Sequence, residues 1–257
     1  MIIAITGSSG YLAQNLIPKL KKKNSLYLYN SKKWDIRKPL IHTLKNVEVV
    51  FHFAGISRLQ KDSIQSLKEF NEINYGGTKN VVSAFPNAKI IFISTISAND
   101  PMTNYARSKI MAEDFIIKNS KKSIILRVAN VCGGKSVPKN CLLGTAIRAS
   151  QTGEIFIYGK DYDSKDGTCI RNFIHIEDLI NLLIRCIDYQ GKNKKINVAS
   201  DQSYTVKEFL DCFKKVNNLS FRITYKKRRK DDYENLNIQN ISNLYIQTKS
   251  LKDMVKI

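Results

Sequence analysis

Short apolar segments alternate along the first half of the chain with segments whose apolar positions recur at helical spacing. The apolar runs are MIIAIT, SLYLY, NVEVVFHFAG, AKIIFIS and SIILRVANV. Three segments between them have the periodicity of amphipathic helices: YLAQNLIPKLKKK, SIQSLKEFNEINYGGTKNVVSAF and NYARSKIMAEDFIIKN. Strands that alternate with helices predict βαβ units, and therefore a parallel sheet with helices on both faces.

The alternation becomes less regular after about residue 133, where the elements shorten and loops lengthen. The stretch RNFIHIEDLINLLIRCI then returns to a strand followed by a helix. A chain of 257 residues suits one large domain or two lobes that share a core. We therefore predict an α/β fold with a first domain over residues 1–132, to which 170–200 return. Residues 133–257 would mainly form a smaller α/β lobe.

Composition narrows the class of protein. Apolar residues make up 43% of the chain, and no run approaches the ~18 apolar residues of a membrane span. No basic segment precedes the first apolar run, so we do not expect a secretory signal. The five cysteines are scattered without a CxxC pair, which indicates free thiols in a reducing compartment and no metal site. We expect a cytoplasmic globular protein that does not bind a membrane.

The formal net charge of +20 raises the question of an anionic partner. The basic residues lie in separate short clusters, KLKKKN, KNSKK, GKNKK and KKRRK, and no RNA- or DNA-binding motif accompanies them. Most charge runs are solvated surface, so we do not favour nucleic acid as the partner. An anionic small-molecule substrate fits the same charge.

A glycine-containing turn follows the first predicted strand, in ITGSSGYLAQNL. Gly7 permits a tight turn, Gly10 lets the backbone approach a pyrophosphate, and Ala13 is small enough for the helix to lie close to the strand. The helix N-terminus attracts the phosphate charge. The pattern therefore indicates a dinucleotide site, although an ordinary strand-to-helix turn also explains the glycines.

The end of the second predicted strand bears on the choice of cofactor. A carboxylate at this position typically binds the ribose hydroxyls of NAD. Here the strand LYLY is followed by Asn30, Ser31, Lys32 and Lys33, with no acid. The lysines could meet the 2′-phosphate of NADP, which favours NADP, but an ordinary polar turn would carry the same residues.

A tyrosine and a lysine four residues apart follow the strand AKIIFIS, in NYARSK. On a helix Tyr105 and Lys109 share one face, and a nearby ammonium stabilises a phenolate and lowers the pKa of the tyrosine from ~10. Tyr105 would then act as a general base toward a sugar or alcohol hydroxyl while a hydride leaves to a nicotinamide. Thr95, at the end of the preceding strand, would hydrogen-bond the same oxygen.

These motifs together resemble the extended branch of the short-chain dehydrogenase/reductase superfamily. That branch combines a TGxxGxx[GA] turn with a Ser/Thr–Tyr–Lys catalytic set, and the segments WDIR, VVFHFAG and NEINYGGTKN are also similar to its motifs. The resemblance implies a Rossmann-like doubly wound parallel sheet whose first domain binds NAD or NADP. The resemblance also implies that the catalytic residues are Thr95, Tyr105 and Lys109. It implies the following cofactor-binding residues: Gly7, Ser9, Gly10, Tyr11, Leu12, Asp35, Ile36, Phe53, Ala54, Gly55, Asn74, Tyr105 and Lys109.

The second half of the chain resembles UDP-galactose 4-epimerases, in YGKDYDSKDGTCIRNFIHIEDL and in RVANVCG. The resemblance implies that the smaller lobe binds a nucleotide sugar, with Asn130 and Thr95 near the sugar and Arg171 on the UDP diphosphate. The segment KKRRKDD is similar to an R-x-G-D motif, which would put Arg229 on the diphosphate and Asp232 on a ribose. Guanidinium groups suit an anionic diphosphate because they bind its oxygens in pairs.

Three departures leave the reaction open. No room remains for a second helix between LYLYN and WDIR, the segment from Thr95 to Tyr105 is short, and Asp231 replaces the glycine of R-x-G-D. The first two features resemble capsule-pathway 4-ketoreductases of nucleotide sugars. Ile96 and Ser97 stand where nucleotide-sugar dehydratases carry an acid pair, so we do not expect dehydration.

We favour a UDP-hexose 4-epimerase that keeps NAD bound, with Tyr105 as the base and Lys109 and Thr95 as its partners; polysaccharide biosynthesis fits the 4-ketoreductase alternative. The alternative is an NADPH-dependent nucleotide-sugar 4-ketoreductase, and an alternative of another class is a noncatalytic dinucleotide- or RNA-binding member of the fold. By family analogy the predicted helices SIQSLKEFNEINYGGTKNVVSAF and YARSKIMAEDFIIKN would pair with a second subunit, which predicts a homodimer.

Overall fold

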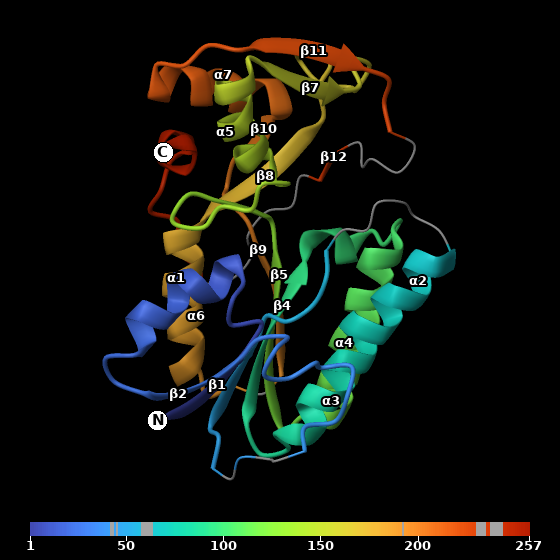
Figure 1. Ribbon diagram of the computed structural model, residues 1–257, viewed down its shortest axis with the longest axis vertical. Coiled ribbons are helices and arrows are strands. Elements are labelled where there is room, and N and C mark those ends of the chain that lie inside the picture. Colours follow the sequence, from blue (N-terminus) through green and yellow to red (C-terminus); the bar gives the residue numbers. More distant parts are fainter. Residues whose placement is uncertain (42–43, 45, 58–63, 192, 230–234, 237–243) are drawn as a thin grey trace. The chain divides into compact units, whose positions relative to one another are not determined.

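The computed structural model describes residues 1–41, 44, 46–57, 64–191, 193–229, 235–236 and 244–257 (Figure 1). The chain divides into two compact units, Met1–Arg127 with Leu183–Ile196, and Val128–Leu182 with Asn197–Ile257. Each unit is built from two separate segments of chain. The assignment of cofactor binding to residues 1–132 and of sugar binding to 133–257 stays a prediction.

A six-stranded sheet in the order β2-β1-β3-β4-β5-β9 organises the first unit. Its strands are β1 (Ile2–Thr6), β2 (Ser25–Tyr29), β3 (Val49–His52), β4 (Lys89–Thr95), β5 (Lys122–Val128) and β9 (Lys194–Val198). β1 pairs in parallel with both β2 and β3, so the strand order reverses at β1. The predicted α/β fold with a Rossmann-like parallel sheet is confirmed.

Helices cover both faces of this sheet (Figure 1). They are α1 (Tyr11–Leu20), α2 (Ile64–Phe70), the π-helix η1 (Asn71–Gly76), α3 (Gly77–Ala84), the 3₁₀-helix η2 (Ile96–Asn99), α4 (Asn104–Asn119) and the end of α6 (Ile176–Asp188). In Figure 1, α1 and α6 lie on one face and α2, α3 and α4 on the other. Double coverage explains why all four residues of β3 are buried.

The largest buried cluster of this unit fills the space between the sheet and the helices α3 and α4. Val50, Ile90 and Phe92 of the strands meet Val81 and Ala112 of the helices. Phe92 is 1% exposed, and the other four side chains are 0% exposed. The cluster fixes α4 against β4, which matters because the predicted catalytic residues lie on these two elements.

Three predicted elements are wrong in detail. The helix expected over 63–85 is interrupted by the π-helical segment Asn71–Gly76. Directly after this segment, the backbone of Gly77 approaches Ile36 so closely that a Cβ on Gly77 would lie 2.5 Å from Ile36 Cδ1. The strand NVEVVFHFAG pairs only over Val49–His52. The strand SIILRVANV divides into β5 and β6 (Asn130–Cys132), which belong to different sheets. Long-range packing decided each of these boundaries.

The second unit combines short strands with three whole helices. It contains β6, β7 (Glu154–Tyr158), β8 (Ile170–His175), β10 (Ser203–Thr205), β11 (Arg222–Lys226), β12 (Asn235–Leu236), α5 (Leu142–Thr152), α7 (Val206–Asn217) and α8 (Leu251–Val255). Phe173 of β8 stacks on Phe209 of α7 at 4.5 Å between ring centroids. This aromatic pair lies in the core of the unit together with Phe213.

No helix in the described part of the chain is both long and apolar enough to cross a membrane. None of the five cysteines, all of which lie in the described part of the chain, forms a disulfide. Among the described residues, no three His, Cys, Asp or Glu side chains gather closely enough to hold a metal ion.

Candidate active site

The predicted glycine turn connects the end of β1 to α1 at the point where the strand order reverses. Gly7 has φ +67°, and a Cβ there would lie 2.7 Å from the main-chain nitrogen of Ala54, so only glycine fits. The N–H of Gly10 donates to the carbonyl of Gly7 over 2.9 Å and closes the turn. In open α/β sheets, ligands bind at such a switch point, outside the carboxyl ends of the strands.

The N-terminus of α1 follows this turn and is suited to an anion. No side chain caps the helix, and its first turn carries no acidic residue. Ala13 is fully buried, which lets α1 lie close to the sheet. Ser9 is exposed, and Tyr11 and Leu12 are half-buried in the first turn. The predicted pyrophosphate residues therefore lie together on one turn and one helix end.

The end of β2 forms a tight polar turn instead of presenting an acid. Asn30 Oδ1 accepts hydrogen bonds from the main-chain N–H groups of Lys32 and Lys33, each over 3.1 Å. Asp35 lies just beyond, and Arg37 donates to its carboxylate over 2.6 Å. These hydrogen bonds from Arg37 hold the pKa of Asp35 below its usual value. Ile36 is 7% exposed and packs against α3, as noted for Gly77.

The loop after β3 holds the predicted cofactor residues Phe53, Ala54 and Gly55. Asn74 fixes this loop, because its Oδ1 accepts from the N–H of Ile56 over 2.9 Å and its Nδ2 donates to the carbonyl of the same residue over 3.0 Å. A Cβ on Gly55 would lie 2.8 Å from Asn74 Oδ1. Asn74 therefore positions the loop rather than only lying near it.

Asn74 also connects the loop to the helix that carries the predicted base. Its Nδ2 donates to Ser108 Oγ over 3.0 Å, and the Ser108 hydroxyl donates to the carbonyl of Tyr105 over 2.8 Å. Ser108 lies between Tyr105 and Lys109 on α4 and was not predicted as a site residue. Its place inside the YARSK segment was the sequence signal that could have identified it.

Tyr105 and Lys109 lie one turn apart on α4, whose first turn is capped by Thr103. The Lys109 ammonium is 7% exposed and lies 4.0 Å from the centroid of the Phe92 ring on β4. Burial lowers the pKa of Lys109 to about 7. The ring of Tyr105 packs against Phe70 at 5.8 Å between centroids. Lys109 is thus held against β4, and Tyr105 against α2.

Thr95 ends β4 and is 9% exposed. Its Oγ1 accepts a hydrogen bond from the N–H of Ser97 over 3.2 Å, which caps the 3₁₀-helix η2. The hydroxyl acts as an acceptor in this bond, so its own proton is available to a substrate oxygen. Lys109 of α4 packs on Phe92, three residues before Thr95 on the same strand.

A buried polar chain that the sequence did not predict lies behind these residues. His52 is 0% exposed and contacts Thr6 at 2.8 Å and Thr78 at 2.9 Å. Burial, with a contribution from the positive charge of Lys109, lowers the pKa of His52 to about 3. The ring is therefore neutral and acts as a structural link between β1, β3 and α3.

The predicted substrate residues lie in the second unit. Asn130 is exposed on β6, and its Nδ2 donates to the carbonyl of Asn172 over 3.0 Å. Arg171 is half-buried on β8 and donates to the carbonyl of Ile170 over 2.8 Å. Arg229 is exposed, with its guanidinium carbon 3.7 Å from the centroid of the Tyr158 ring. Asp232 lies outside the described residues.

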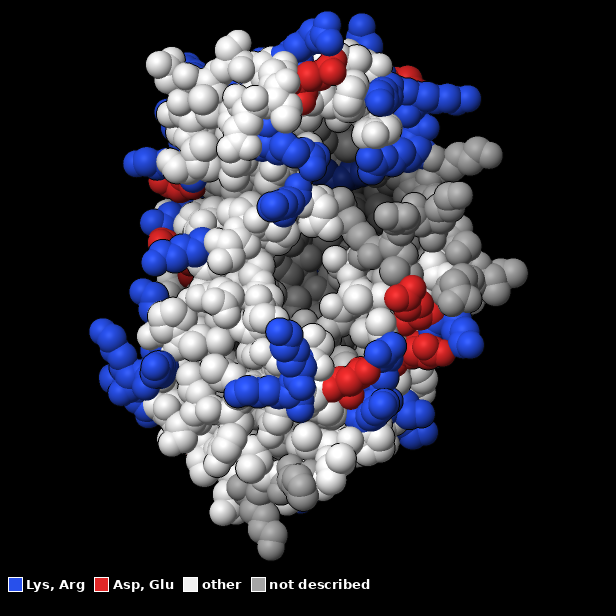
Figure 2. Space-filling model, in the orientation of Figure 1, with Lys and Arg blue, Asp and Glu red and all other residues white. Residues whose placement is uncertain are grey.

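Cations are spread over the molecule in separate groups, and Figure 2 shows several of them on one face. Four cations near the ends of the parallel strands β7 and β11 lie over aromatic rings: Lys160 over Tyr225, Lys226 over Phe156, Arg228 over Tyr162 and Arg229 over Tyr158. A ring face covered by a cation is closed to a stacking base on that side. Each of the four rings is therefore paired with a cation of the same unit.

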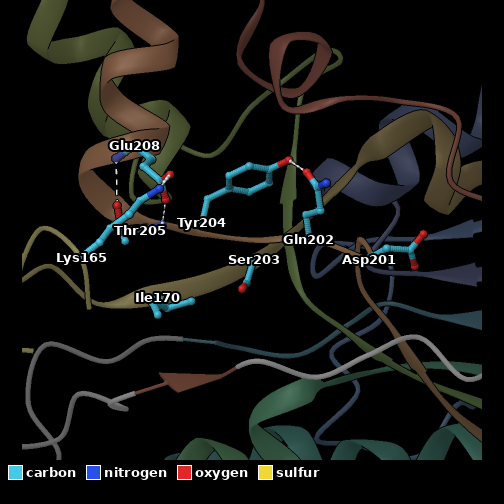
Figure 3. Close-up of a pocket in the computed structure, with 8 residues that line it drawn as sticks. All are labelled: Lys165, Ile170, Asp201, Gln202, Ser203, Tyr204, Thr205 and Glu208. Carbon is cyan, nitrogen blue, oxygen red and sulfur yellow. Dashed lines mark hydrogen bonds and ion pairs between the residues drawn. The ribbon is translucent and has the colours of Figure 1, made fainter. Parts of the chain in front are cut away.

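An open pocket of about 520 Å³ lies in the second unit, beside the edge strand β10 (Figure 3). Its lining residues are Lys165, Ile170, Asp201, Gln202, Ser203, Tyr204, Thr205 and Glu208. Figure 3 shows the Tyr204 hydroxyl donating to Gln202 over 2.7 Å, and Glu208 capping α7 with Thr205. None of the predicted site residues lines this pocket. Several of its polar groups already bond with one another, in the pairs Lys165–Glu208, Thr205–Glu208 and Tyr204–Gln202.

The strand order and the glycine turn at its switch point define an α/β protein with a dinucleotide-type fold. The model of the NAD dependent epimerase/dehydratase family matches residues 3–199, and the chain belongs to that family. The UDP-glucose 4-epimerase of Rhizobium meliloti (strain 1021) is 29% identical over 217 residues, which are 71% of this chain and 66% of that protein. The UDP-glucose 4-epimerase of Lactobacillus helveticus is 24% identical over 290 residues, with 92% and 88% covered.

The chain spans about two thirds of the Rhizobium protein and 58% of a putative UDP-arabinose 4-epimerase of Arabidopsis thaliana. Among solved structures, the UDP-glucose 4-epimerase of Bifidobacterium longum in complex with NAD+ and UDP has a TM-score of 0.85 at 20% identity. That alignment covers 99% of this chain and 96% of the other. The similarity shows that the two proteins share a fold.

The residues present fit a dinucleotide. The turn at Gly7 brings backbone against backbone and leaves no room for a side chain, while the N-terminus of α1 lacks a side-chain cap. Within the described part of the chain, the mostly buried ammonium of Lys109 has no hydrogen-bond acceptor or acidic partner in contact. A ribose hydroxyl would satisfy such a group, because a buried cation without an acceptor is costly.

Proposed function

We propose that this protein is an NAD-dependent 4-epimerase of a UDP-linked sugar, with Tyr105 as the base and Lys109 and Thr95 as its partners. The observation that supports it best is the placement of Lys109, one turn beyond Tyr105 on α4 and buried against Phe92 of β4. The family and the named relatives, which are UDP-glucose 4-epimerases, point to the same chemistry.

The glycine turn and Lys109 would hold NAD, which when bound would supply reversible hydride transfer at C4 of the sugar, to and from opposite faces. The residues of this chain hold and move the proton. Tyr105 Oη takes the proton of the C4 hydroxyl as the ketone forms and returns it as the alcohol is restored. The Lys109 ammonium stabilises the tyrosine anion between these steps, and Thr95 donates a hydrogen bond to the sugar oxygen.

The nucleotide part of the substrate would be held by the second unit. Arg171 and Arg229 carry the charge and the paired N–H groups that bind a diphosphate, with Asn130 and Asp232 as the further substrate residues. We further propose a homodimer through α2 to α4. Met111 and Ile117 of α4 and Leu67 of α2 are each more than a third exposed, which is an apolar surface suited to a second copy.

A second candidate is an NADPH-dependent 4-ketoreductase of a nucleotide sugar. The turn after β2 favours it, because Asn30 binds the backbone of Lys32 and Lys33 and no carboxylate is present to bind a ribose hydroxyl of NAD. The lysines extend from this turn and could meet a 2′-phosphate. The two candidates share the catalytic residues and differ in how the cofactor is held.

The first experiment identifies the nucleotide released when freshly purified protein is denatured, by absorbance and mass spectrometry. Stoichiometric NAD(H), together with interconversion of UDP-glucose and UDP-galactose or of another UDP-sugar pair, would establish the epimerase. An empty protein that binds NADPH and reduces a 4-keto nucleotide sugar would establish the reductase.

Tyr105→Phe provides the matched variant, since it removes only the hydroxyl. Turnover should fall by roughly 10² to 10⁴, the usual contribution of a general base, while nucleotide binding persists. A protein that binds neither nucleotide, and whose sugar assays do not respond to this substitution, would overturn the proposal and favour a noncatalytic role.

A further inference from the structure

Glu113 is the third residue of a stripe on α4 that begins with Tyr105 and Lys109, each one helical turn apart. Its side chain is 0% exposed. Burial raises the pKa of this carboxyl, but hydrogen bonds from Arg127, Lys195 and Ser94 outweigh burial and lower it overall. Glu113 is therefore a buried carboxylate that stays ionised.

Three elements of the sheet supply its partners. Arg127 of β5 forks onto the carboxylate, with Nε 2.9 Å from Oε1 and Nη2 2.7 Å from Oε2. Lys195 of β9 lies 2.9 Å from Oε2. The hydroxyl of Ser94 on β4 donates to Oε1 over 2.5 Å. One carboxylate on α4 thus binds β4, β5 and β9 at once.

Two of these contacts lead to the predicted catalytic threonine. Ser94 is the residue before Thr95. Arg127 also donates through Nη1 to Asn99 Oδ1 over 2.7 Å, and Asn99 Nδ2 donates to the carbonyl of Ile96 over 2.9 Å. The contacts of Glu113 and Arg127 therefore hold the main chain on both sides of Thr95 against α4.

We infer that Glu113 is a positioning residue, which fixes the distance between Thr95 and the Tyr105–Lys109 face of α4 and places a carboxylate one helical turn from Lys109. The inference deepens the proposed function and rests on it for its catalytic part. The inference also includes Arg127, which binds both Glu113 and Asn99 and thereby connects α4 to η2. Neither residue touches the predicted cofactor or substrate set, so both act through other groups.

The surroundings of Lys109 support the electrostatic part. His52 of β3 faces Lys109 as a neutral ring, Phe92 of β4 presents its ring face, and Glu113 is the acidic group that acts on it from α4. Burial lowers the pKa of Lys109 and the Glu113 charge raises it. The ion pairs with Arg127 and Lys195 stabilise the ionised form of Glu113.

The test replaces the carboxylate by an amide, Glu113→Gln, and measures two quantities. The first is turnover of the nucleotide sugar across pH. The second is the titration of Lys109 in ¹³C-ε-lysine-labelled protein, assigned as the resonance missing from Lys109→Met. We expect kcat to fall about tenfold or more with little change in KM. The pKa of Lys109 should fall by at least roughly one unit, because an opposite charge nearby is lost.

Two variants separate position from charge. Asp114→Asn, at the next position on α4, removes an exposed acid that also lies 4.0 Å from Lys195, and should change neither quantity. Arg127→Lys keeps the positive charge beside Glu113 but loses the hydrogen bond to Asn99, so kcat should fall while the titration of Lys109 stays at its wild-type position. Arg127→Lys also keeps the test decisive if Glu113→Gln does not fold.

Wild-type turnover and a wild-type Lys109 titration in folded Glu113→Gln would overturn the inference, as would equal effects of Asp114→Asn. Unchanged kcat in Arg127→Lys would overturn the positioning role. Failure of the proposed function is distinguishable, because the wild-type protein would then lack turnover. The NMR titration would still show whether the Glu113 charge raises the pKa of Lys109.

Discussion

The Nε2 atom of His52 lies 2.9 Å from the hydroxyl oxygen of Thr78, and this contact determines which ring nitrogen carries the proton. Thr78 donates its own proton to the carbonyl of Asn74 over 2.6 Å, so its oxygen accepts from His52 Nε2–H. The Nδ1 atom then accepts from the hydroxyl of Thr6, which in turn accepts from the N–H of Ala54. Hydrogen bonds are therefore donated in one direction, from Ala54 through Thr6, His52 and Thr78 to the carbonyl of Asn74.

The tautomer of His52 is the first prediction. Long-range ¹H–¹⁵N correlation spectra should show the Nε2–H form of the neutral ring throughout pH 5 to 9, because each neighbour fixes one proton and the pKa is lowered to about 3. His175, which is buried at the end of β8 and whose pKa burial also lowers, is the histidine to compare in the same spectra. A His52 resonance that titrates near pH 6.5 would contradict the hydrogen-bond order.

The same shift predicts a contribution to stability that depends on pH. The folded ring binds a proton only near pH 3, whereas an unfolded imidazole binds one near pH 6.5. The unfolded state therefore binds more protons between these values, and the free energy of unfolding contributed by His52 rises with pH across that window. Urea unfolding at several pH values should give a steeper rise for the wild type than for His52→Gln. Parallel curves for the two proteins would contradict the assignment.

Gly7 and Gly153 form a matched pair for a test of the glycine turn. Both have positive φ, +67° and +82°, so alanine strains the backbone at both positions. A Cβ on Gly7 meets the backbone of Ala54 at 2.7 Å, whereas a Cβ on Gly153 meets nothing within 4 Å. Gly153→Ala should cost about 1 kcal/mol in the free energy of unfolding and leave nucleotide binding intact.

Gly7→Ala should weaken nucleotide binding much more, because the turn has to move away from Ala54. Calorimetric titration with NAD and NADP checks both variants, and urea unfolding gives their stabilities. Equal nucleotide affinity in the two alanine variants would show that the close approach at Gly7 does not form the cofactor site.

Lys89 gives a prediction about stability that is independent of function. It begins β4, is 8% exposed, and its Nζ donates to the carbonyls of Ile187 and Tyr189 over 2.5 and 2.7 Å at the end of α6. Lys89→Met leaves these carbonyls without a donor and should cost about 1–3 kcal/mol in the free energy of unfolding. The exposed Lys122 on β5 is the control, and Lys122→Met should change stability little.

Local features of the sequence were sufficient for much of the fold. Strand and helix periodicities gave the order of elements from β1 to α4, since burial on both faces leaves continuous apolar runs in the strands. The glycine turn was predictable because only glycine fits at Gly7, and the Tyr105–Lys109 pair because residues four apart meet on any helix.

Features that depend on distant contacts were not predictable. The π-helical segment Asn71–Gly76 lies inside a helical pattern, and the lengths of β3 and β5 depend on which sheet each residue joins. The partners of His52, Thr6 and Thr78, are 46 and 26 residues away from it in the sequence. No pattern in a single sequence reports such pairings.

The sequence by itself determined the class of fold and predicted the Thr95, Tyr105 and Lys109 set, because periodicity and short spacings are properties of neighbouring residues. Only the tertiary structure decided the state of those residues. Burial against Phe92 lowers the pKa of Lys109, and the charge of Glu113 opposes that effect. Glu113 is itself held by Arg127 and Lys195, which reach it from strands that are adjacent only after the chain has folded.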